Sequence, residues 1–432
     1  MLNGTVATVA RRGICLAIVW AAVALVCAQW SPALAGTWKG KVSDVGGVKT
    51  VANPAVAMEP PVTVKLEHLW TVGGDTEDED EFFGVIADIE IDNSGNVYLL
   101  DSQLAEVKIY TKDGELIRTI GREGEGPGEF RLPNAMFFTK EGNIAVLQTV
   151  PGKIVLLTPD GKPAGDFPLP QPADGGFQIL GGGQARAGNI VLFLGRTAFQ
   201  AGEGKWSRSD FLVSVDTKGT QLSQYAAKTK TIVMADATLR FSDWDTFERR
   251  WELGPDGKVY ACESYPNYEI TVFNKAGAVE KKITREYGHQ ALGAKEKDML
   301  KRIMDFSAQQ IPGCKVVIDD NAKDIESIHV RDDGNIWVLT STGARTKPAG
   351  SLGVFDVLNP EGQYVKAVTL MGEGDPLSDL YLLVKNRLYV VTDFLQAAMA
   401  AQGMQGAVGE EEEAEPMAVR CFKLEGDLLS AR

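Results

Sequence analysis

Residues 86–120 read IADIEIDNSGNVYLLDSQLAEVKIYTKDGELIRTI, and this stretch decides the fold. Apolar and β-branched residues form four short runs that are separated by polar turns. Two of the turns contain Gly95 and Gly114, and glycine readily adopts the positive φ that tight hairpins between antiparallel strands require. The stretch therefore predicts four antiparallel strands over Ile86–Ile91, Asn96–Asp101, Glu106–Thr111 and Glu115–Ile120.

The same unit, a glycine turn followed by an apolar strand and later by a second glycine turn, recurs along the chain. The first turn of each copy lies at Gly95, Gly142, Gly188, Gly257, Gly334 and, in degraded form, Asn386. The second turn lies at Gly114, Gly161, Gly219, Gly277, Gly362 and Gly426. Six pairs of turns predict six four-stranded units, and radial repetition of such units is a β-propeller. Two stacked β-sandwiches, the competing all-β architecture, would not explain six copies of one pattern.

A single helical insertion interrupts the repeats. Over Leu292–Gln310 the apolar residues recur at helical spacing and form one face, made of Met299, Leu300, Ile303, Met304 and Phe306. The predicted fold is therefore an all-β, six-bladed propeller of four-stranded antiparallel blades with one short helical insertion.

One internal match predicts how the ring closes. Gly73–Phe82 (GGDTEDEDEF) overlays Gly121–Phe130 (GREGEGPGEF) at a constant offset. Leu66–Val72 should therefore be an outermost strand, although it precedes the first blade. We expect it to complete blade six, because mixing the two chain ends in one blade removes an exposed edge. The alternative is that Asp427–Ala431 forms that outer strand.

Residues 1–35 have the features of a signal peptide. Arg11 and Arg12 precede an apolar run over 14–30, and Ala33-Leu34-Ala35 supplies the small residues that a signal peptidase recognises. An uncleaved membrane anchor is the alternative, since the run is just long enough to span a bilayer. We expect cleavage and export to the periplasm or the outside of the cell. The predicted order is a signal peptide (1–35), an N-terminal linker (36–61) and the propeller (62–432).

Charge and hydropathy argue against nucleic acid as a partner and against a second membrane-spanning segment. The chain has 44 Lys+Arg against 58 Asp+Glu and a net charge of −14, so it offers no global field that attracts nucleic acid. Beyond the signal peptide no stretch is apolar enough to span a bilayer. Cleavage of the signal peptide would leave Cys262, Cys314 and Cys421. Their spacing does not show whether two of them form a disulfide or all three are free thiols.

The junction between the first two repeats resembles a known group of proteins. Gly121–Phe130 with Pro133, together with Gly95–Asp101 (GNVYLLD), is similar to bacterial six-bladed β-propeller proteins related to NHL repeats. The resemblance covers the chain from about residue 62 to its end. It implies the fold, frequent export and binding through one face, but no reaction. Related six-bladed enzymes include amidating lyases, gluconolactonase-like lactonases and strictosidine synthase-like proteins, and none of their site patterns is matched.

Polar residues end several strands at the same end of the predicted ring. The positions six residues after each first turn are Asp101, Gln148, Leu194, Glu263, Thr340 and Thr392, with Arg196 and Asp393 just beyond two of them. Such a partly acidic ring could hold a divalent cation such as calcium, which prefers oxygen ligands. The alternative is that these side chains cap strand ends by bonding loop amides. Arg122 and Arg196 could grip an anion.

Catalytic signatures are missing from the sequence. His68, His289 and His329 fall in unrelated predicted elements, which makes a multi-histidine metal site improbable, and no nucleophile elbow marks a Ser-His-Asp triad. No cofactor and no catalytic residue is predicted. We expect an exported binding or scaffolding module that contacts a protein or small ligand of the cell envelope through Asp101, Arg122, Arg196, Glu263 and Asp393. The alternative function is a metal-dependent hydrolase or lactonase that uses the acidic ring.

Deletion of residues 61–73 tests the predicted closure. Without the closing strand, blade six should lack its outer strand, and the ring should lose its cooperative unfolding transition. Differential scanning calorimetry of the shortened and full-length chains would show this, and an unchanged transition would refute the closure.

Overall fold

The computed structural model describes residues 36–76, 81–170, 177–245, 247, 249–309, 311–404 and 416–424. The chain separates into two compact units, Met1–Trp38 and Lys39–Arg432. The expected signal peptide, residues 1–35, lies outside the described residues, so its cleavage stays a prediction. All of the described strands belong to the second unit.

The first blade contains the four strands predicted from residues 86–120. They are β5 (Ile86–Ile91), β6 (Val97–Asp101), β7 (Glu106–Tyr110) and β8 (Leu116–Ile120). They lie side by side in this order, and every neighbouring pair is antiparallel. Every residue of β6 is buried, whereas β8 is exposed apart from its last residue. The inner strands are therefore enclosed by the neighbouring blades, and β8 forms the outer rim.

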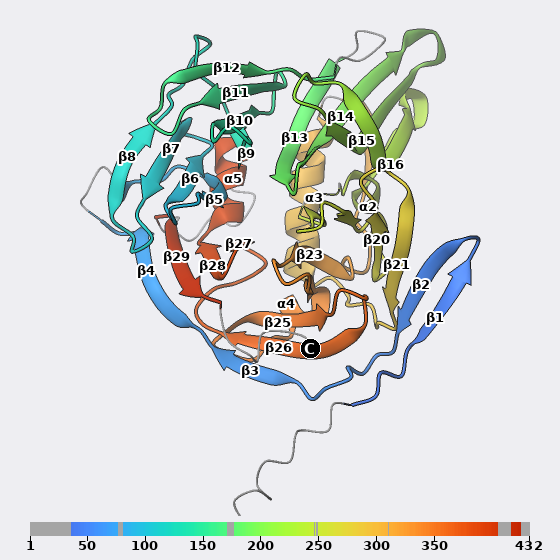
Figure 1. Ribbon diagram of the computed structural model, residues 1–432. Coiled ribbons are helices and arrows are strands. Elements are labelled where there is room, and N and C mark those ends of the chain that lie inside the picture. Colours follow the sequence, from blue (N-terminus) through green and yellow to red (C-terminus); the bar gives the residue numbers. More distant parts are fainter. Residues whose placement is uncertain are drawn as a thin grey trace, which may run out of the picture. The chain divides into compact units, whose positions relative to one another are not determined.

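The other five blades repeat this arrangement. Blade two contains β9 (Pro133–Phe138), β10 (Ile144–Gln148), β11 (Lys153–Leu157) and β12 (Pro163–Phe167). Blade three contains β13 (Phe177–Arg186), β14 (Asn189–Gln200), β15 (Lys205–Val215) and β16 (Gln221–Val233). Blade four contains β18 (Trp251–Leu253), β19 (Val259–Ala261), β20 (Glu269–Phe273) and β21 (Val279–Arg285). Blade five contains β23 (Ile325–Val330), β24 (Ile336–Thr340), β25 (Ser351–Leu358) and β26 (Tyr364–Met371). Blade six contains β27 (Leu380–Val384), β28 (Arg387–Val391), β29 (Ala418–Lys423) and β4 (Glu67–Gly73). The six blades form a ring, which confirms the predicted all-β propeller (Figure 1).

Hydrophobic side chains fill the spaces between neighbouring blades. Between blades one and two, Val107 and Ile109 belong to the same buried cluster as Met136 and Val155. Equivalent clusters join the other blades. Burial of this apolar surface, at roughly 25 cal/mol per Å², is the main force that holds each blade to the next.

The hairpin glycine between the third and fourth strands packs against the outer strand of the preceding blade. A Cβ atom on Gly161 would lie 2.8 Å from Ile120 of β8, and one on Gly362 would lie 2.7 Å from Ile283 of β21. Real Cβ atoms do not approach so closely. The second glycine of the repeat is therefore required by blade packing as well as by its turn.

The strand β4 closes the ring, as predicted. It pairs in antiparallel register with β29, with Trp70 opposite Cys421 and Val72 opposite Val419. The alternative closing strand, Asp427–Ala431, lies outside the described residues. Strands from both ends of the chain thus share one blade, and blade six holds the first and last parts of the ring together.

The chain before β4 adds strands to two further blades. A hairpin of β1 (Lys41–Val45) and β2 (Val48–Asn53) extends blade four, because β2 pairs in parallel with β21. Strand β3 (Val62–Lys65) pairs in parallel with β26 of blade five. Residues 36–61 were predicted to be a linker, whereas part of this range forms the β1–β2 hairpin. No local pattern signals this pairing, because it depends on the open outer edge of β21.

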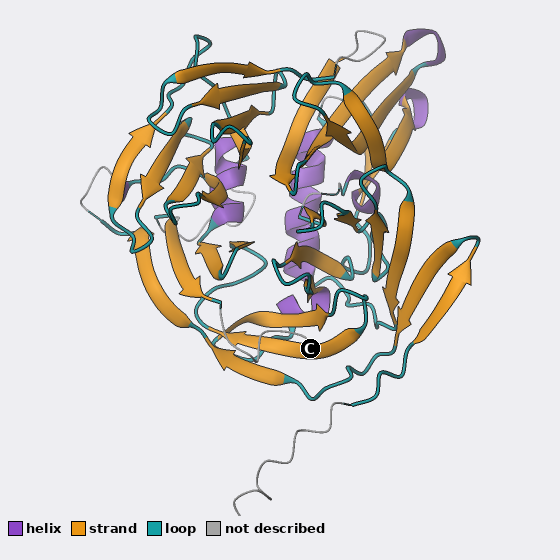
Figure 2. Ribbon diagram, viewed as in Figure 1, coloured by secondary structure: helices purple, strands orange, loops and turns teal. Residues whose placement is uncertain are grey.

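Four α-helices lie among the described residues, where the sequence predicted one helix. Figure 2 shows the helices in purple among the strands. The helix α3 (Ala294–Ala308) confirms the predicted insertion. The others are α2 (Phe241–Trp244), α4 (Ser341–Arg345) and α5 (Phe394–Ala401). Helices of one turn are too short to show a helical period, and α5 is apolar on nearly all sides, so no amphipathic pattern marks them. Within the described residues no helix is long and apolar enough to cross a bilayer.

All four helices lie at one end of the ring. The helices α4 and α5 follow second strands of their blades, and α2 and α3 follow fourth strands. Because successive strands of a blade run in opposite directions, second and fourth strands finish at the same end. We call this the loop-rich end of the propeller. It also carries a parallel pair of short strands, β17 (Thr238–Arg240) and β22 (Lys315–Val317).

The three described cysteines are free thiols. Cys262 and Cys421 are buried in the blades, and Cys314 is partly exposed. The sequence left open whether two of these cysteines form a disulfide, and the structure shows none among the three.

Trp70 provides a test of the closing strand. Its side chain is 7% exposed, its Nε1 donates to the carbonyl of Lys112 at 3.0 Å, and it packs on Gly114 of blade one. Trp70→Ala should lower the free energy of unfolding by about 3–5 kcal/mol, because it leaves a cavity between blades six and one.

Urea denaturation followed by circular dichroism would measure this loss. Leu222→Ala is the matched control, since Leu222 is an apolar residue on the outer strand β16 that is 63% exposed. A loss for Trp70→Ala no greater than for Leu222→Ala would contradict the assignment.

Candidate functional site

Blade three extends beyond the other blades at the loop-rich end. Strands β14, β15 and β16 contain 12, 11 and 13 residues, whereas the corresponding strands of blade one contain five each. Arg196 of β14 lies opposite Ser209 of β15, which lies opposite Thr229 of β16. Residues directly opposite one another share a face of the sheet. The extension therefore places a charged group beside two hydroxyl groups.

The two faces of this extension differ. On β15, Trp206 and Arg208 point to one face, and there Trp206 stacks on Trp244 of α2 with ring centroids 5.3 Å apart. The guanidinium of Arg208 lies 5.4 Å from the same ring. Ser207 and Ser209 alternate with these residues and point to the opposite face. The helix α2 therefore covers one face, and the hydroxyl-bearing face lines a pocket.

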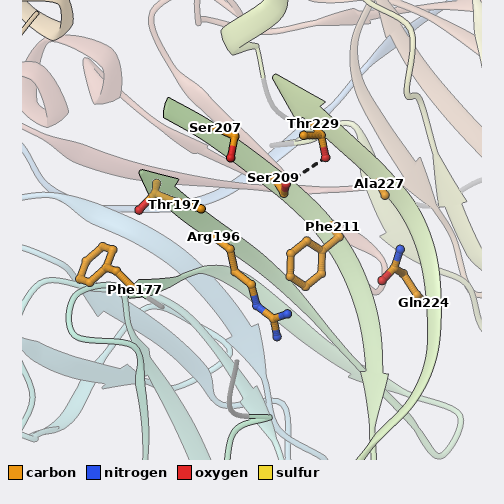
Figure 3. A pocket seen from close by; sticks show the side chains of 10 residues that line it. Phe177, Arg196, Thr197, Ser207, Ser209, Phe211, Gln224, Ala227 and Thr229 are labelled. Atoms are coloured by element: carbon orange, nitrogen blue, oxygen red, sulfur yellow. Dashed lines mark hydrogen bonds between the residues drawn. The ribbon is translucent and has the colours of Figure 1, made fainter. Parts of the chain in front are cut away.

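The pocket has a volume of about 340 Å³ (Figure 3). We call it the blade-three pocket, and it is lined by Phe177, Arg196, Thr197, Ala198, Ser207, Ser209, Phe211, Gln224, Ala227 and Thr229. Its volume lies in the range of small-ligand sites, which are usually about 300–1,000 Å³. The aromatic rings of the lining offer apolar contact to a ligand, and its hydroxyls and one guanidinium offer polar contact.

Among the described residues, Arg196 is the only charged one in the lining of the blade-three pocket. Its Nε donates to Oε1 of Gln178 at 3.0 Å, and its Cζ lies 4.8 Å from the centre of the Phe211 ring. These two contacts fix the plane of the guanidinium. Within the described part of the chain, its two terminal nitrogens have no hydrogen-bond partner. They are donors in a fixed fork geometry that suits a carboxylate.

The hydroxyls beside Arg196 are also ordered. Oγ of Ser209 and Oγ1 of Thr229 lie 2.9 Å apart and share a hydrogen bond (Figure 3). Each hydroxyl has further lone pairs that can accept from a ligand. Phe177, which is 53% exposed, adds an aromatic surface at the rim of the pocket.

Asp101 caps a loop at the end of β6. It is fully buried, and its carboxylate accepts backbone hydrogen bonds from Gly84, Val85, Gln103 and Leu104 at 2.7–3.1 Å. This is the strand-capping role that the sequence left as the alternative to ligand binding. Its oxygen lone pairs are used by the protein itself.

The other predicted ligand-binding residues lie in separate environments. Arg122 is exposed and pairs with Glu129, from its Nε to Oε1 at 2.6 Å. Glu263 follows β19 and is exposed as a residue, but its carboxyl group is partly enclosed. This burial raises the pKa of the carboxyl, and a hydrogen bond with Thr271 opposes the rise. Asp393 precedes α5 with φ of 53°, and its backbone N–H donates to Asp379. Of the five predicted residues, only Arg196 lines the blade-three pocket.

The described residues contain no group of three or more His, Cys, Asp or Glu side chains that could hold a metal ion. Binding of calcium at the predicted acidic ring therefore stays a prediction, and the described residues offer no group of ligands for it.

A second polar group faces the axis of the ring. One register position of the innermost strands carries Glu90, Phe137, Gln184, Glu252, His329 and Leu382. Glu90 of blade one and Glu252 of blade four belong to opposite blades, yet the charge of Glu252 helps to raise the pKa of Glu90. The charge of Glu252 is thus one of the smaller causes that act on the carboxyl of Glu90.

Burial and like charges act on the axial carboxyls. Burial first, and then the charge of Asp88, raise the pKa of Glu90 to about 8, while Lys385 opposes the rise. Burial also raises the pKa of Asp88 to about 6, against hydrogen bonds from the amides of Met136 and Ile89. The axis therefore holds carboxyl groups that resist ionisation.

This axial group was not predicted. The three histidines were assigned to unrelated elements and His329 was given no partner, because Glu252 is far away in the chain and only the ring brings the two together. A signal does exist: Glu90, Glu252 and His329 each stand five residues before a first-turn glycine. Comparison of the residues at this position in all six repeats would have shown polar side chains at equivalent places on the innermost strands.

Comparisons with known proteins agree with the fold. A family model described as a 6-bladed beta-propeller matches residues 75–166. A gluconolactonase from Xanthomonas campestris is 11% identical, over 83% of this chain and 98% of its own, with a TM-score of 0.41. A virginiamycin B lyase from Staphylococcus aureus is 11% identical, over 76% and 82%, with a TM-score of 0.39. A predicted exported protein from Bacteroides fragilis is 13% identical, over 84% and 100%, with a TM-score of 0.44.

These likenesses concern the fold alone and carry nothing about ligand or activity. No curated protein matches the chain by sequence. The relation to NHL repeats stays a resemblance.

Replacement of the axial carboxyl tests its environment. The pKa of Glu90 is about 8 in the folded protein, above its ordinary value of 4.5, so the folded state holds this proton more tightly. The free energy of unfolding should therefore fall as the pH rises from 4.5 to about 8. Below pH 4.5 the carboxyl of Glu90 is protonated in both the folded and the unfolded state, so it costs no stability there. Glu90→Gln removes this titration. The difference in free energy of unfolding between Glu90→Gln and the wild type should therefore shift in favour of the variant by about 2 kcal/mol when the pH is raised from about 5 to about 9.

Chemical denaturation at both pH values would measure the gain. Glu115→Gln, at an exposed position before β8, is the control. If the difference between Glu90→Gln and the wild type were the same at both pH values, the axial environment would not be as described.

Proposed function

We propose that the protein is an exported binding module that holds a small carboxylate-bearing ligand in the blade-three pocket. The observation that carries this proposal is the oriented guanidinium of Arg196, whose terminal nitrogens lack a described partner in a pocket of about 340 Å³. A positively charged group that has no counter-ion among the described residues favours an anion.

The lining supports an aromatic acid in particular. Phe177 and Phe211 give apolar contact on either side of Arg196, and the hydroxyls of Ser207 and Ser209 provide hydrogen bonds. A ligand with an aromatic or apolar body and one carboxylate would satisfy both kinds of contact. The carboxylate could belong to a free acid or to the C-terminus of a peptide, since both present the same group.

Export gives this module its setting. The support is the signal-peptide pattern of residues 1–35, together with the absence of another stretch apolar enough to span a bilayer. The ligand would then be a compound or peptide of the cell envelope. Strand register fixes the spacing of the pocket residues, so the site needs no large rearrangement to bind.

Binding of N-acetylphenylalanine and of its uncharged amide would test the proposal. The acid should bind and the amide should bind at least about tenfold more weakly, because the amide cannot form the charge-assisted pair with Arg196. Arg196→Gln should weaken binding of the acid by a similar factor and leave the amide unaffected. Isothermal titration calorimetry measures both, and a short peptide ending in phenylalanine distinguishes a peptide ligand from a free acid.

Arg122→Gln is the matched control. Arg122 carries the same charge and was also expected to grip an anion, but the structure pairs it with Glu129 and leaves it out of the pocket lining. Equal losses for both arginine variants would indicate a general charge effect. Equal affinity of the acid and the amide would overturn the proposal.

A further inference from the structure

The innermost strand of blade five carries a serine and a histidine side by side. Ser327 and His329 are two residues apart on β23, so both side chains leave the same face of the strand. Oγ of Ser327 and Nε2 of His329 lie 3.0 Å apart. This is the distance of the hydrogen bond through which a histidine takes a proton from a serine nucleophile.

The other ring nitrogen of His329 faces a carboxylate. Nδ1 lies 3.6 Å from Oε2 of Glu252, which comes from β18 of the neighbouring blade. A carboxylate at this place favours the tautomer with its proton on Nδ1, which leaves Nε2 free to accept from Ser327. The carboxylate also stabilises the positive charge that the imidazole acquires on taking the proton. The three residues have the order of contacts of a serine nucleophile, a base and an orienting acid.

The group is largely enclosed. Ser327 and His329 are buried, with 8% of their surface exposed, and the side chain of Glu252 keeps 18%. These small exposed areas are where water and an ester would have to reach the group.

We propose that Ser327, His329 and Glu252 form a catalytic triad that hydrolyses esters at the axis of the ring. Oγ of Ser327 attacks the ester carbonyl carbon while Nε2 of His329 takes its proton. The ester C–O bond then breaks, and His329 returns the proton to the departing alkoxide, which leaves as the alcohol. Water, deprotonated by His329, attacks the acyl-serine, and this releases the carboxylic acid and restores Ser327.

The neighbouring charges define the class of ester. Burial raises the pKa of Glu90 and of Asp88, so negative charge is disfavoured in this part of the ring, and an anionic acyl group would be disfavoured in the same way. The substrate is therefore a neutral or positively charged ester. This activity is independent of the blade-three pocket, which lies on another blade and prefers an anion.

A fluorophosphonate probe with a rhodamine label tests the triad on the full chain. The probe phosphonylates an activated serine: Oγ forms a bond to phosphorus, fluoride leaves, and the proton passes to the base. We expect labelling that mass spectrometry places on Ser327. Ser327→Ala should abolish it, His329→Gln should slow it at least about a hundredfold, and Glu252→Gln at least about tenfold.

Ser94→Ala is the matched control, since Ser94 is an exposed turn serine of blade one, and it should label like the wild type. Thermal unfolding checks that each variant is folded, and hydrolysis of p-nitrophenyl acetate should fall in the same order as the labelling. The proposal is overturned if the wild type is not labelled, or if the label lies on a residue other than Ser327. It is also overturned if folded His329→Gln labels at the wild-type rate. Mapping the label on the wild type decides the matter even where a variant does not fold.

Discussion

Each blade of this propeller is held in place by the fourth strand of the blade before it. Ile120 of β8 lies 2.8 Å from the position of a Cβ atom on Gly161, and Ile283 of β21 lies 2.7 Å from that of a Cβ atom on Gly362. In blade six the rim is formed by β4, and its Trp70 packs on Gly114 of blade one. Since every blade depends on its neighbour, the whole ring depends on β4 reaching its place beside β29.

Closure of the ring has consequences for chemistry at both places where polar residues gather. On the axis, it sets blade four beside blade five, so Glu252 and His329 meet although they come from different repeats, and the charge of Glu252 also acts on Glu90 of blade one. At the loop-rich end, the strands of blade three are longer than those of blade one and continue past the region that neighbouring blades enclose. The blade-three pocket therefore needs a single blade, whereas the axial group needs the closed ring.

Much of the fold could be predicted because it is written as a repeated local pattern. The strands of blade one, the closing strand and α3 lie where turn glycines and apolar periodicity put them. The β1–β2 hairpin was missed because its pairing with β21 is not local. Arg196 was chosen for its place at a strand end, but the reason it lines a pocket is the register across β14, β15 and β16. Asp101 was chosen by the same rule and instead caps a loop, because backbone amides converge on it.

The sequence by itself determined the number of blades, the order of their strands and the strand that closes them. Turn geometry and alternation act over a few residues, so a single chain displays them without any knowledge of distant contacts. Only the tertiary structure decided which polar side chains share a site. Ser327 and His329 are neighbours on one strand, but Glu252 joins them only when blade four packs on blade five. The residues that could carry chemistry were thus visible in the sequence, and their grouping was set by the closure of the ring.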